Sequence, residues 1–157
     1  MARSITPEEK EYAQQLLAKA RAAMKAIEDY DQAKIDRLCQ AVGWATANEK
    51  TFTRLCRQGV EESGIGDWEG RPGKRFKIIG ILRDCLRQKS MGVVEEIPEK
   101  GIVKYAKPAG VICGVVPMTN PTLTPSGEGI LALKAKDAII FAPHPRTKKT
   151  SFEAVEV

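Results

Sequence analysis

Apolar residues recur at helical spacing three times in the first half of the chain. The first stretch follows Thr6, where Pro7 suits the first helical position and Glu9 completes a capping box. Two more stretches begin near Asp31 and Lys50. The apolar positions are Tyr12, Leu16, Ala20, Met24 and Ile27, then Ile35, Leu38, Cys39, Val42 and Ala45, then Phe52, Leu55, Cys56 and Val60. This period predicts three amphipathic helices whose apolar faces form a core, with no functional site among them.

A turn-rich break follows, "GDWEGRPGKR", after glycines that are typical of a helix end. The next residues, from about Lys74 to Lys89, predict a helix rich in basic side chains. We expect these charges to form a solvated face. Phosphate binding by the same charges is an alternative.

From Gly92 onward the pattern changes from helical to extended. Two short β-branched stretches flank a turn at residues 98–101, which predicts a hairpin. Residues 109–117, "AGVICGVVP", form a continuous apolar run that predicts a strand buried on both faces, with Cys113 inside it. A helix weakened by Gly127 and Gly129 should follow, then a second buried strand, "DAIIFAP", and a last helix.

This order predicts an α/β fold, in which N-terminal helices and a β-hairpin lead into an incomplete Rossmann-like parallel βαβ unit. We divide the chain into a helical segment (1–91), a hairpin (92–108) and a first βαβ part (109–157). Two strands cannot form a sheet covered on both faces. The sheet therefore needs partners that this sequence does not contain.

Composition narrows the class of protein. The chain has 157 residues, of which 43% are hydrophobic, so a packed core is expected. A net charge of +5, spread along the chain, and 6% aromatic residues argue against nucleic-acid binding. The N-terminus has no apolar signal and no stretch is long enough for a membrane span. We expect a soluble, cytoplasmic protein.

The four cysteines do not suggest a metal site. Cys39, Cys56, Cys85 and Cys113 form no C-x-x-C pair, and His144 is the single histidine. We expect buried, reduced thiols and no metal.

The most specific local feature is Asn120, which stands between Thr119 and Pro121 after the first buried strand. Ligands of α/β sheets gather beyond the carboxyl ends of the strands, and "APHPR" follows the second strand in the same way. An amide held there by prolines could stabilise an oxyanion, with the dipole of the next helix behind it. Alternatively, Asn120 only caps that helix. His144 lies between two prolines, where it is weak evidence for a base and could simply be exposed.

Two longer stretches resemble a known family. "GVICGVVPMTNPT" followed by "ALKAKDAIIFAPHPRTKKT" is similar to the aldehyde dehydrogenase superfamily, and most to its CoA-acylating branch of acetaldehyde, propionaldehyde and sulfoacetaldehyde dehydrogenases. "GWATANEKTFTRLC", "GVEESGIGDWEGR" and "EEIPEKGIVKYAKPAGVICGVVP" resemble the same branch. The similarity covers nearly the whole chain from the second helix onward.

The resemblance implies roles for particular residues. Asn120 matches the asparagine of the oxyanion hole, and Pro117, Met118 and Thr119 match residues beside it in the cofactor cleft. Ala142, Pro143, His144 and Pro145 match the segment that meets the adenosine half of NAD or CoA. The hairpin matches strands of subunit association, which implies a homo-oligomer. The cofactor would be NAD or NADP, with CoA and a small aldehyde as substrates.

The resemblance also implies what this sequence lacks. The family is much longer, its catalytic domain is absent here, and none of the four cysteines lies at the position of the nucleophile. We therefore expect the N-terminal cofactor-domain part of an oxidoreductase that is inactive by itself. One alternative is a truncated, non-catalytic interaction protein that binds a full-length dehydrogenase or a shell. A weaker alternative is a small nucleotide-binding module.

Overall fold

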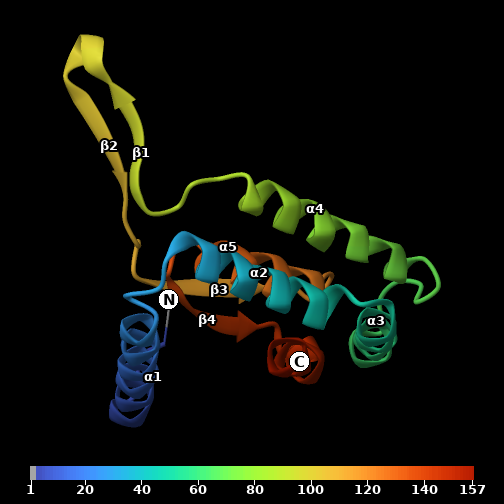
Figure 1. Ribbon diagram of the computed structural model, residues 1–157. Coiled ribbons are helices and arrows are strands. Elements are labelled where there is room, and N and C mark those ends of the chain that lie inside the picture. The colour runs from blue at the N-terminus through green and yellow to red at the C-terminus, as the bar shows by residue number, and fades with distance from the viewer. Residues whose placement is uncertain (1–2) are drawn as a thin grey trace.

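The computed structural model describes residues 3–157 as a helical layer packed on a two-stranded parallel sheet, with a hairpin that projects away (Figure 1). The helices are α1 (Pro7–Ala26), α2 (Gln32–Ala47), α3 (Glu49–Ser63), α4 (Arg75–Leu86), α5 (Leu123–Lys134) and α6 (Lys148–Glu156). The strands are β1 (Gly92–Ile97), β2 (Ile102–Ala106), β3 (Val111–Val116) and β4 (Ala138–Pro143). Residues 3–157 also contain three short 3-10 helices: η1 (Arg71–Lys74), η2 (Pro98–Lys100) and η3 (Pro145–Thr147).

The predicted helix boundaries are confirmed where a local signal set them. Thr6 and Glu9 form the capping box of α1, and the Asp31 carboxylate accepts from the Lys34 N–H at the start of α2. Gly64 ends α3 in the left-handed region at φ 69°. These ends follow the sequence because a cap satisfies backbone groups that the helix itself leaves unpaired.

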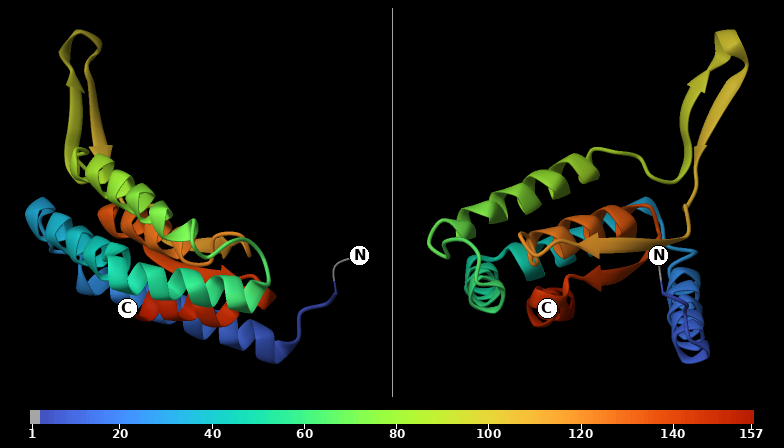
Figure 2. Two further views of the ribbon diagram at one scale, coloured as in Figure 1. Left: turned by 90° about the vertical axis from the view of Figure 1, so that its right-hand side faces the viewer. Right: turned by 180° about the vertical axis from the view of Figure 1, so that it is seen from behind.

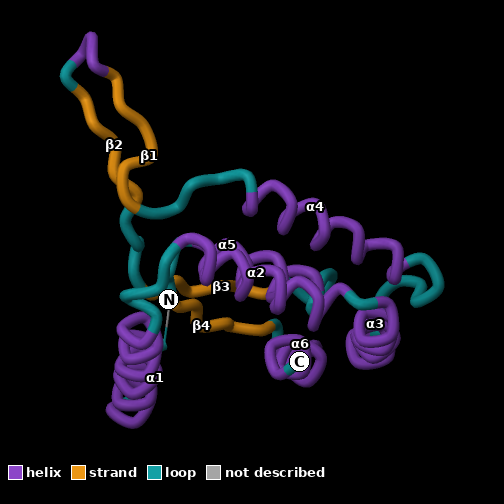
Figure 3. The backbone as a smooth tube through the Cα atoms, viewed as in Figure 1, coloured by secondary structure: helices purple, strands orange, loops and turns teal. Residues whose placement is uncertain are grey.

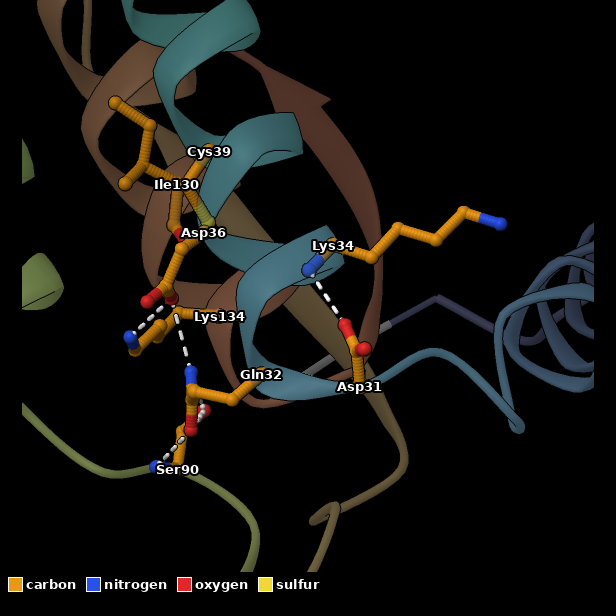
Figure 4. Close-up of polar contacts among 8 residues, drawn as sticks. All are labelled: Asp31, Gln32, Lys34, Asp36, Cys39, Ser90, Ile130 and Lys134. Carbon is orange, nitrogen blue, oxygen red and sulfur yellow. Dashed lines mark hydrogen bonds and ion pairs between the residues drawn. The ribbon is translucent and has the colours of Figure 1, made fainter.

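The core lies where α2, α4 and α5 meet, and in the view of Figure 3 α4 lies above the other two helices. Its most buried side chains are Ile35, Cys39, Phe52, Cys56, Ile78, Cys85 and Ile130. Next to this core, Lys134 Nζ of α5 forms an ion pair with Asp36 Oδ1 of α2 at 2.5 Å (Figure 4). The Gln32 side-chain amide donates both to Asp36 and to Ser90, which lies in the segment after α4. The buried thiols predicted for Cys39, Cys56 and Cys85 are confirmed.

The βαβ unit is present as predicted. β3 and β4 pair in parallel, with Val116 opposite Pro143, and α5 crosses between them. Within residues 3–157 these two strands pair only with each other, so the sheet is incomplete.

The prediction that β3 is buried on both faces is wrong, and β4 is less buried than predicted. Val115 is 72% exposed and Cys113 is exposed, whereas Gly114 and Val116 on the alternate face are buried beneath α5. β4 is mostly half-buried. A continuous apolar run is typical of a strand covered on both faces. In this sheet, within residues 3–157, the carboxyl half of β3 is covered on one face only, by α5.

The hairpin of β1 and β2 stands clear of the body in all views (Figure 2). Gly101, at φ 61°, closes its turn, and Glu95 pairs with Lys104 across the strands. Val94, Ile102, Val103 and Tyr105 are exposed along it. Among residues 3–157, none of the helices is both long and apolar enough to cross a membrane.

Candidate functional site at the strand ends

The site is built on the turn that joins β3 to α5. The Asn120 N–H donates to the Pro117 carbonyl at 3.3 Å, and the Asn120 carbonyl accepts from the Thr124 N–H at 3.2 Å. Pro121 is fully buried behind it. The turn is therefore fixed on both sides of Asn120 by backbone bonds and by a buried proline ring.

The side chain of Asn120 does not cap the helix. Its Oδ1 accepts from Lys74 Nζ at 2.8 Å, and its Nδ2 lies 3.4 Å from Thr119 Oγ1. The residue at the cap of α5 is Thr122, which makes no side-chain capping bond. The alternative in which Asn120 serves only as a helix cap is thus wrong, and the half-buried amide remains available for another role.

Two basic residues of η1 hold this turn from outside. Arg71 donates through Nη1 to the Thr119 carbonyl at 3.1 Å and through Nη2 to the Ile65 carbonyl at 2.9 Å. Lys74 contacts Asn120 as described. Burial lowers the pKa of Lys74, and the charges of Arg71 and Lys77 lower it further. These contacts of Arg71 and Lys74 were not predicted from the sequence, in which the break is typical of a turn and Lys74 of a solvated helix face. The available signal was the spacing in "RPGK", because residues i and i+3 of a 3-10 helix lie on one side.

A small crevice lies behind the Asn120 amide, between α3, η1 and the start of α5. It is lined by Phe52, Cys56, Gly59, Arg71, Lys74, Asn120, Pro121, Thr122 and Leu123. Its volume is about 10 Å³, which is room for about one water molecule. Burial raises the pKa of the Cys56 thiol to about 11, although Arg71 and Lys74 act in the opposite direction. A buried thiol of this kind is a packing residue, not a nucleophile.

The second predicted segment lies beside the first. The His144 N–H donates to the Val116 carbonyl at 3.0 Å, so the turns after β3 and β4 are neighbours, as expected for parallel strands. The ring of His144 accepts at Nδ1 from the Arg146 N–H at 3.1 Å and caps η3. His144 is half-buried, so the expectation of a simply exposed ring is not met, and only its Nε2 is left for other partners.

Both turns are tied to the same loop after α3. Arg146 donates to the Ser63 carbonyl, and Arg71 donates to the Ile65 carbonyl two residues later. Gly66 has φ 85°, and a Cβ there would stand 2.7 Å from Arg71 Nη2. The "SGIG" loop therefore connects the carboxyl ends of β3 and β4 through two arginines.

The predicted site residues differ in their exposure to solvent. The exposed ones are Pro117, Thr119, Ala142 and Pro145, and the half-buried ones are Met118, Asn120, Pro143 and His144.

A parallel βαβ unit with an asparagine fixed at its strand ends places the chain among α/β folds. No family model matches the chain. A sulfoacetaldehyde dehydrogenase from an Acholeplasma species is 45% identical over 141 residues, which are 89% of this chain and 29% of that protein. An acylating sulfoacetaldehyde dehydrogenase from Bilophila wadsworthia is 40% identical over 139 residues, 88% of this chain and 30% of that protein.

Solved structures agree with these relatives. The crystal structure of an acetylating aldehyde dehydrogenase from Geobacillus thermoglucosidasius matches with a TM-score of 0.88 and 29% identity, over 99% of this chain and 34% of that one. The chain thus spans about a third of the length of the proteins it matches. Its homologues are acylating aldehyde dehydrogenases, and it corresponds to their N-terminal portion. The predicted resemblance to this branch is confirmed, while the roles of the individual site residues stay predictions.

Proposed function

We propose that this chain is the N-terminal, cofactor-domain part of an enzyme that converts an aldehyde to an acyl-CoA with NAD or NADP. The observation that carries the proposal is the Asn120 amide, which is fixed at the end of β3 beside Lys74 and is not used as a helix cap. The relatives that are named as acylating or acetylating dehydrogenases supply the reaction class.

In this proposal Asn120 stabilises the oxyanion that forms when a thiolate attacks the aldehyde carbonyl. The donor is its Nδ2, while its Oδ1, which can only accept, faces Lys74. The nucleophilic cysteine would come from sequence outside this chain, because Cys39, Cys56 and Cys85 are buried and Cys113 precedes the turn on β3. The chain by itself should therefore be inactive.

The segments 117–119 and 142–145 would line the cofactor. When bound, NAD or NADP accepts a hydride and CoA accepts the acyl group. The residues present fit such a group, since small and apolar side chains lie exposed at adjacent strand ends (Pro117, Thr119, Ala142 and Pro145). These two segments would position the cofactor at the edge of the sheet.

The projecting hairpin would serve subunit association. Ile102, Val103 and Tyr105 expose apolar surface on a strand pair that is free of the body. Such surface is costly for a monomer and fits burial against a second subunit. This would make the complete enzyme a homo-oligomer.

The test is to assay the chain alone and fused to the remaining two-thirds of the acylating Bilophila wadsworthia enzyme, following NADH or NADPH and acyl-CoA formation from sulfoacetaldehyde. We expect no turnover by the chain alone and turnover by the fusion protein. Changing Asn120 to Ala in the fusion should lower kcat by about 10² to 10³, the usual cost of one oxyanion donor. Robust turnover by the chain alone, or an active N120A fusion protein, contradicts the proposal.

A second candidate function is that of a non-catalytic partner of a full-length dehydrogenase. It is favoured by the unpaired outer edges of β3 and β4 within residues 3–157 and by the exposed Val115. Co-purification of the tagged chain with a longer dehydrogenase subunit would support it. A clean monomer in light scattering, with no such subunit, would argue against it.

A further inference from the structure

Asn120 can serve as an oxyanion donor only if its amide is turned the right way. A carboxamide presents an acceptor on one side and two donors on the other, and little in its shape prevents a flip. Its close neighbours therefore decide its orientation. In this chain the strongest of them is Lys74, whose Nζ lies 2.8 Å from Oδ1.

An ammonium group donates hydrogen bonds and accepts none, so Lys74 can face only the oxygen of the amide. The nitrogen is thereby turned to the opposite side, where its one hydrogen bond within residues 3–157 is to Thr119 Oγ1 at 3.4 Å. A cation on the oxygen also draws electron density from the nitrogen, which makes its N–H groups better donors.

The position of Lys74 is itself determined by the turn that precedes α4. The Asp67 carboxylate accepts from the Glu69 and Gly70 N–H groups at 2.9 and 3.0 Å and shapes this turn. Pro72 then fixes the start of η1. The side chains of Arg71 and Lys74 lie on one side of η1. Arg71 donates a hydrogen bond to the Thr119 carbonyl, and Lys74 donates one to the side chain of Asn120, the next residue along the chain.

We propose that Lys74 is a positioning residue that fixes and polarises the Asn120 amide, so that its Nδ2 faces the reacting carbonyl. The inference rests on the proposed oxyanion role of Asn120. Lys74 does not contact substrate in this arrangement and acts through Asn120 alone.

The first test observes the amide directly, by NMR of the labelled chain, and needs no activity. Lys74→Met removes the cation, Lys74→Arg keeps it, and Lys77→Met removes an equal charge from an exposed residue three positions on, which makes no hydrogen bond or ion pair within the described residues. We expect the Asn120 side-chain resonances to shift in K74M and to stay near their wild-type positions in K77M. K74R should retain most of the wild-type position.

Alkaline titration adds a second readout. The groups that face Lys74 are Arg71, Lys77 and Cys56. As Lys74 loses its proton, the Asn120 Nδ2 resonance should move with the Lys74 Nζ resonance in the wild type and in K77M, whereas in K74M only the change caused by the Cys56 thiol, whose pKa is about 11, should remain. Asn120 resonances that are identical in K74M and wild type overturn the inference.

Kinetics of the fusion protein separate this inference from the proposed function. We expect K74M to lower kcat about tenfold with little change in the aldehyde KM, as for loss of one charge-assisted hydrogen bond. K74R should recover part of the loss, K77M should keep full activity, and K74M/N120A should be no slower than N120A. Loss of activity in N120A but not in K74M overturns only the role of Lys74. Full activity in N120A overturns the proposed role of Asn120, and with it this inference.

Discussion

Gly114 of β3 lies directly against Glu128 of α5: a Cβ built at Gly114 would stand 2.7 Å from Glu128 Oε2 and 2.8 Å from Phe141 Cδ1. The helix crosses the sheet at this point because one residue of the strand has no side chain. Gly114→Ala should therefore lower the free energy of unfolding by about 1–3 kcal/mol, as overpacking does. Urea unfolding followed by circular dichroism measures the change.

Gly80 provides the matched control for this substitution. It lies inside α4, and a Cβ there would meet no atom within 4 Å. Gly80→Ala should leave stability unchanged or raise it by up to about 1 kcal/mol, through helix propensity alone. Equal changes in the free energy of unfolding for the two substitutions would show that the close approach at Gly114 does not affect stability.

The ion pair of Asp36 and Lys134 is asymmetric in its exposure, with side chains 26% and 6% exposed (Figure 4). Asp36→Ala leaves the buried Lys134 ammonium without its carboxylate partner, and should lower the free energy of unfolding by about 3–5 kcal/mol. Lys134→Met should cost less, because Asp36 keeps its hydrogen bond from Gln32 and reaches water. Thermal and urea unfolding of both variants test the order. If K134M is the less stable variant, burial of the ammonium is not the dominant cost.

Glu62 of α3 caps α6 from outside that helix. Its carboxylate accepts from the N–H groups of Lys149 and Thr150 and from the Thr150 hydroxyl. Burial raises the pKa of Glu62, but these hydrogen bonds lower it more, so the net pKa lies below the usual 4.5. Glu62→Ala should cost about 1–3 kcal/mol at neutral pH by leaving these donors without their acceptor.

The pH dependence of this cost follows from the sign of the shift. A carboxylate with a lowered folded pKa contributes stability that is present above its unfolded pKa and lost as pH falls through the folded value. The difference between wild type and E62A should therefore narrow below pH 4.5. Glu61→Ala, at the exposed neighbouring position that pairs with Arg57, should cost less than about 1 kcal/mol at neutral pH. A gap that stays constant from neutral to acid pH would mean that Glu62 acts without its charge.

The cysteines should differ sharply in reactivity. Burial raises the pKa of Cys39 and of Cys56 to about 11, and also raises that of Cys85, whereas Cys113 is exposed on β3. Near neutral pH a maleimide should modify one thiol per folded chain, and Cys113→Ser should abolish this fast reaction. All four should react in denaturant. Mass spectrometry of the labelled chain checks the count, and fast labelling of Cys39 in the folded state would contradict the packing of the core.

Much of the fold was predictable because its signals are local. Thr6 with Glu9, Asp31 and Gly64 set helix ends through backbone groups only a few residues away. The turn at residues 98–101 and the proline after β3 marked the hairpin and the strand end in the same way. Asn120 was singled out by its flanking residues, and its place at the carboxyl end of a parallel strand followed from the order of elements.

The burial of the strands could not be read in the same manner. An apolar run predicts that side chains are buried, but it does not indicate which element covers each face of the strand. In this structure Cys113 and Val115 lie on a face of β3 that no element covers within residues 3–157, and they are exposed. The partner of Asn120 was equally hidden, since Lys74 lies 46 residues earlier along the chain. Local patterns were enough to predict the helices and strands, their order and the turn that carries Asn120. The open face of the sheet and the cation beside the amide could not be predicted, because both depend on contacts between distant segments that no local pattern encodes.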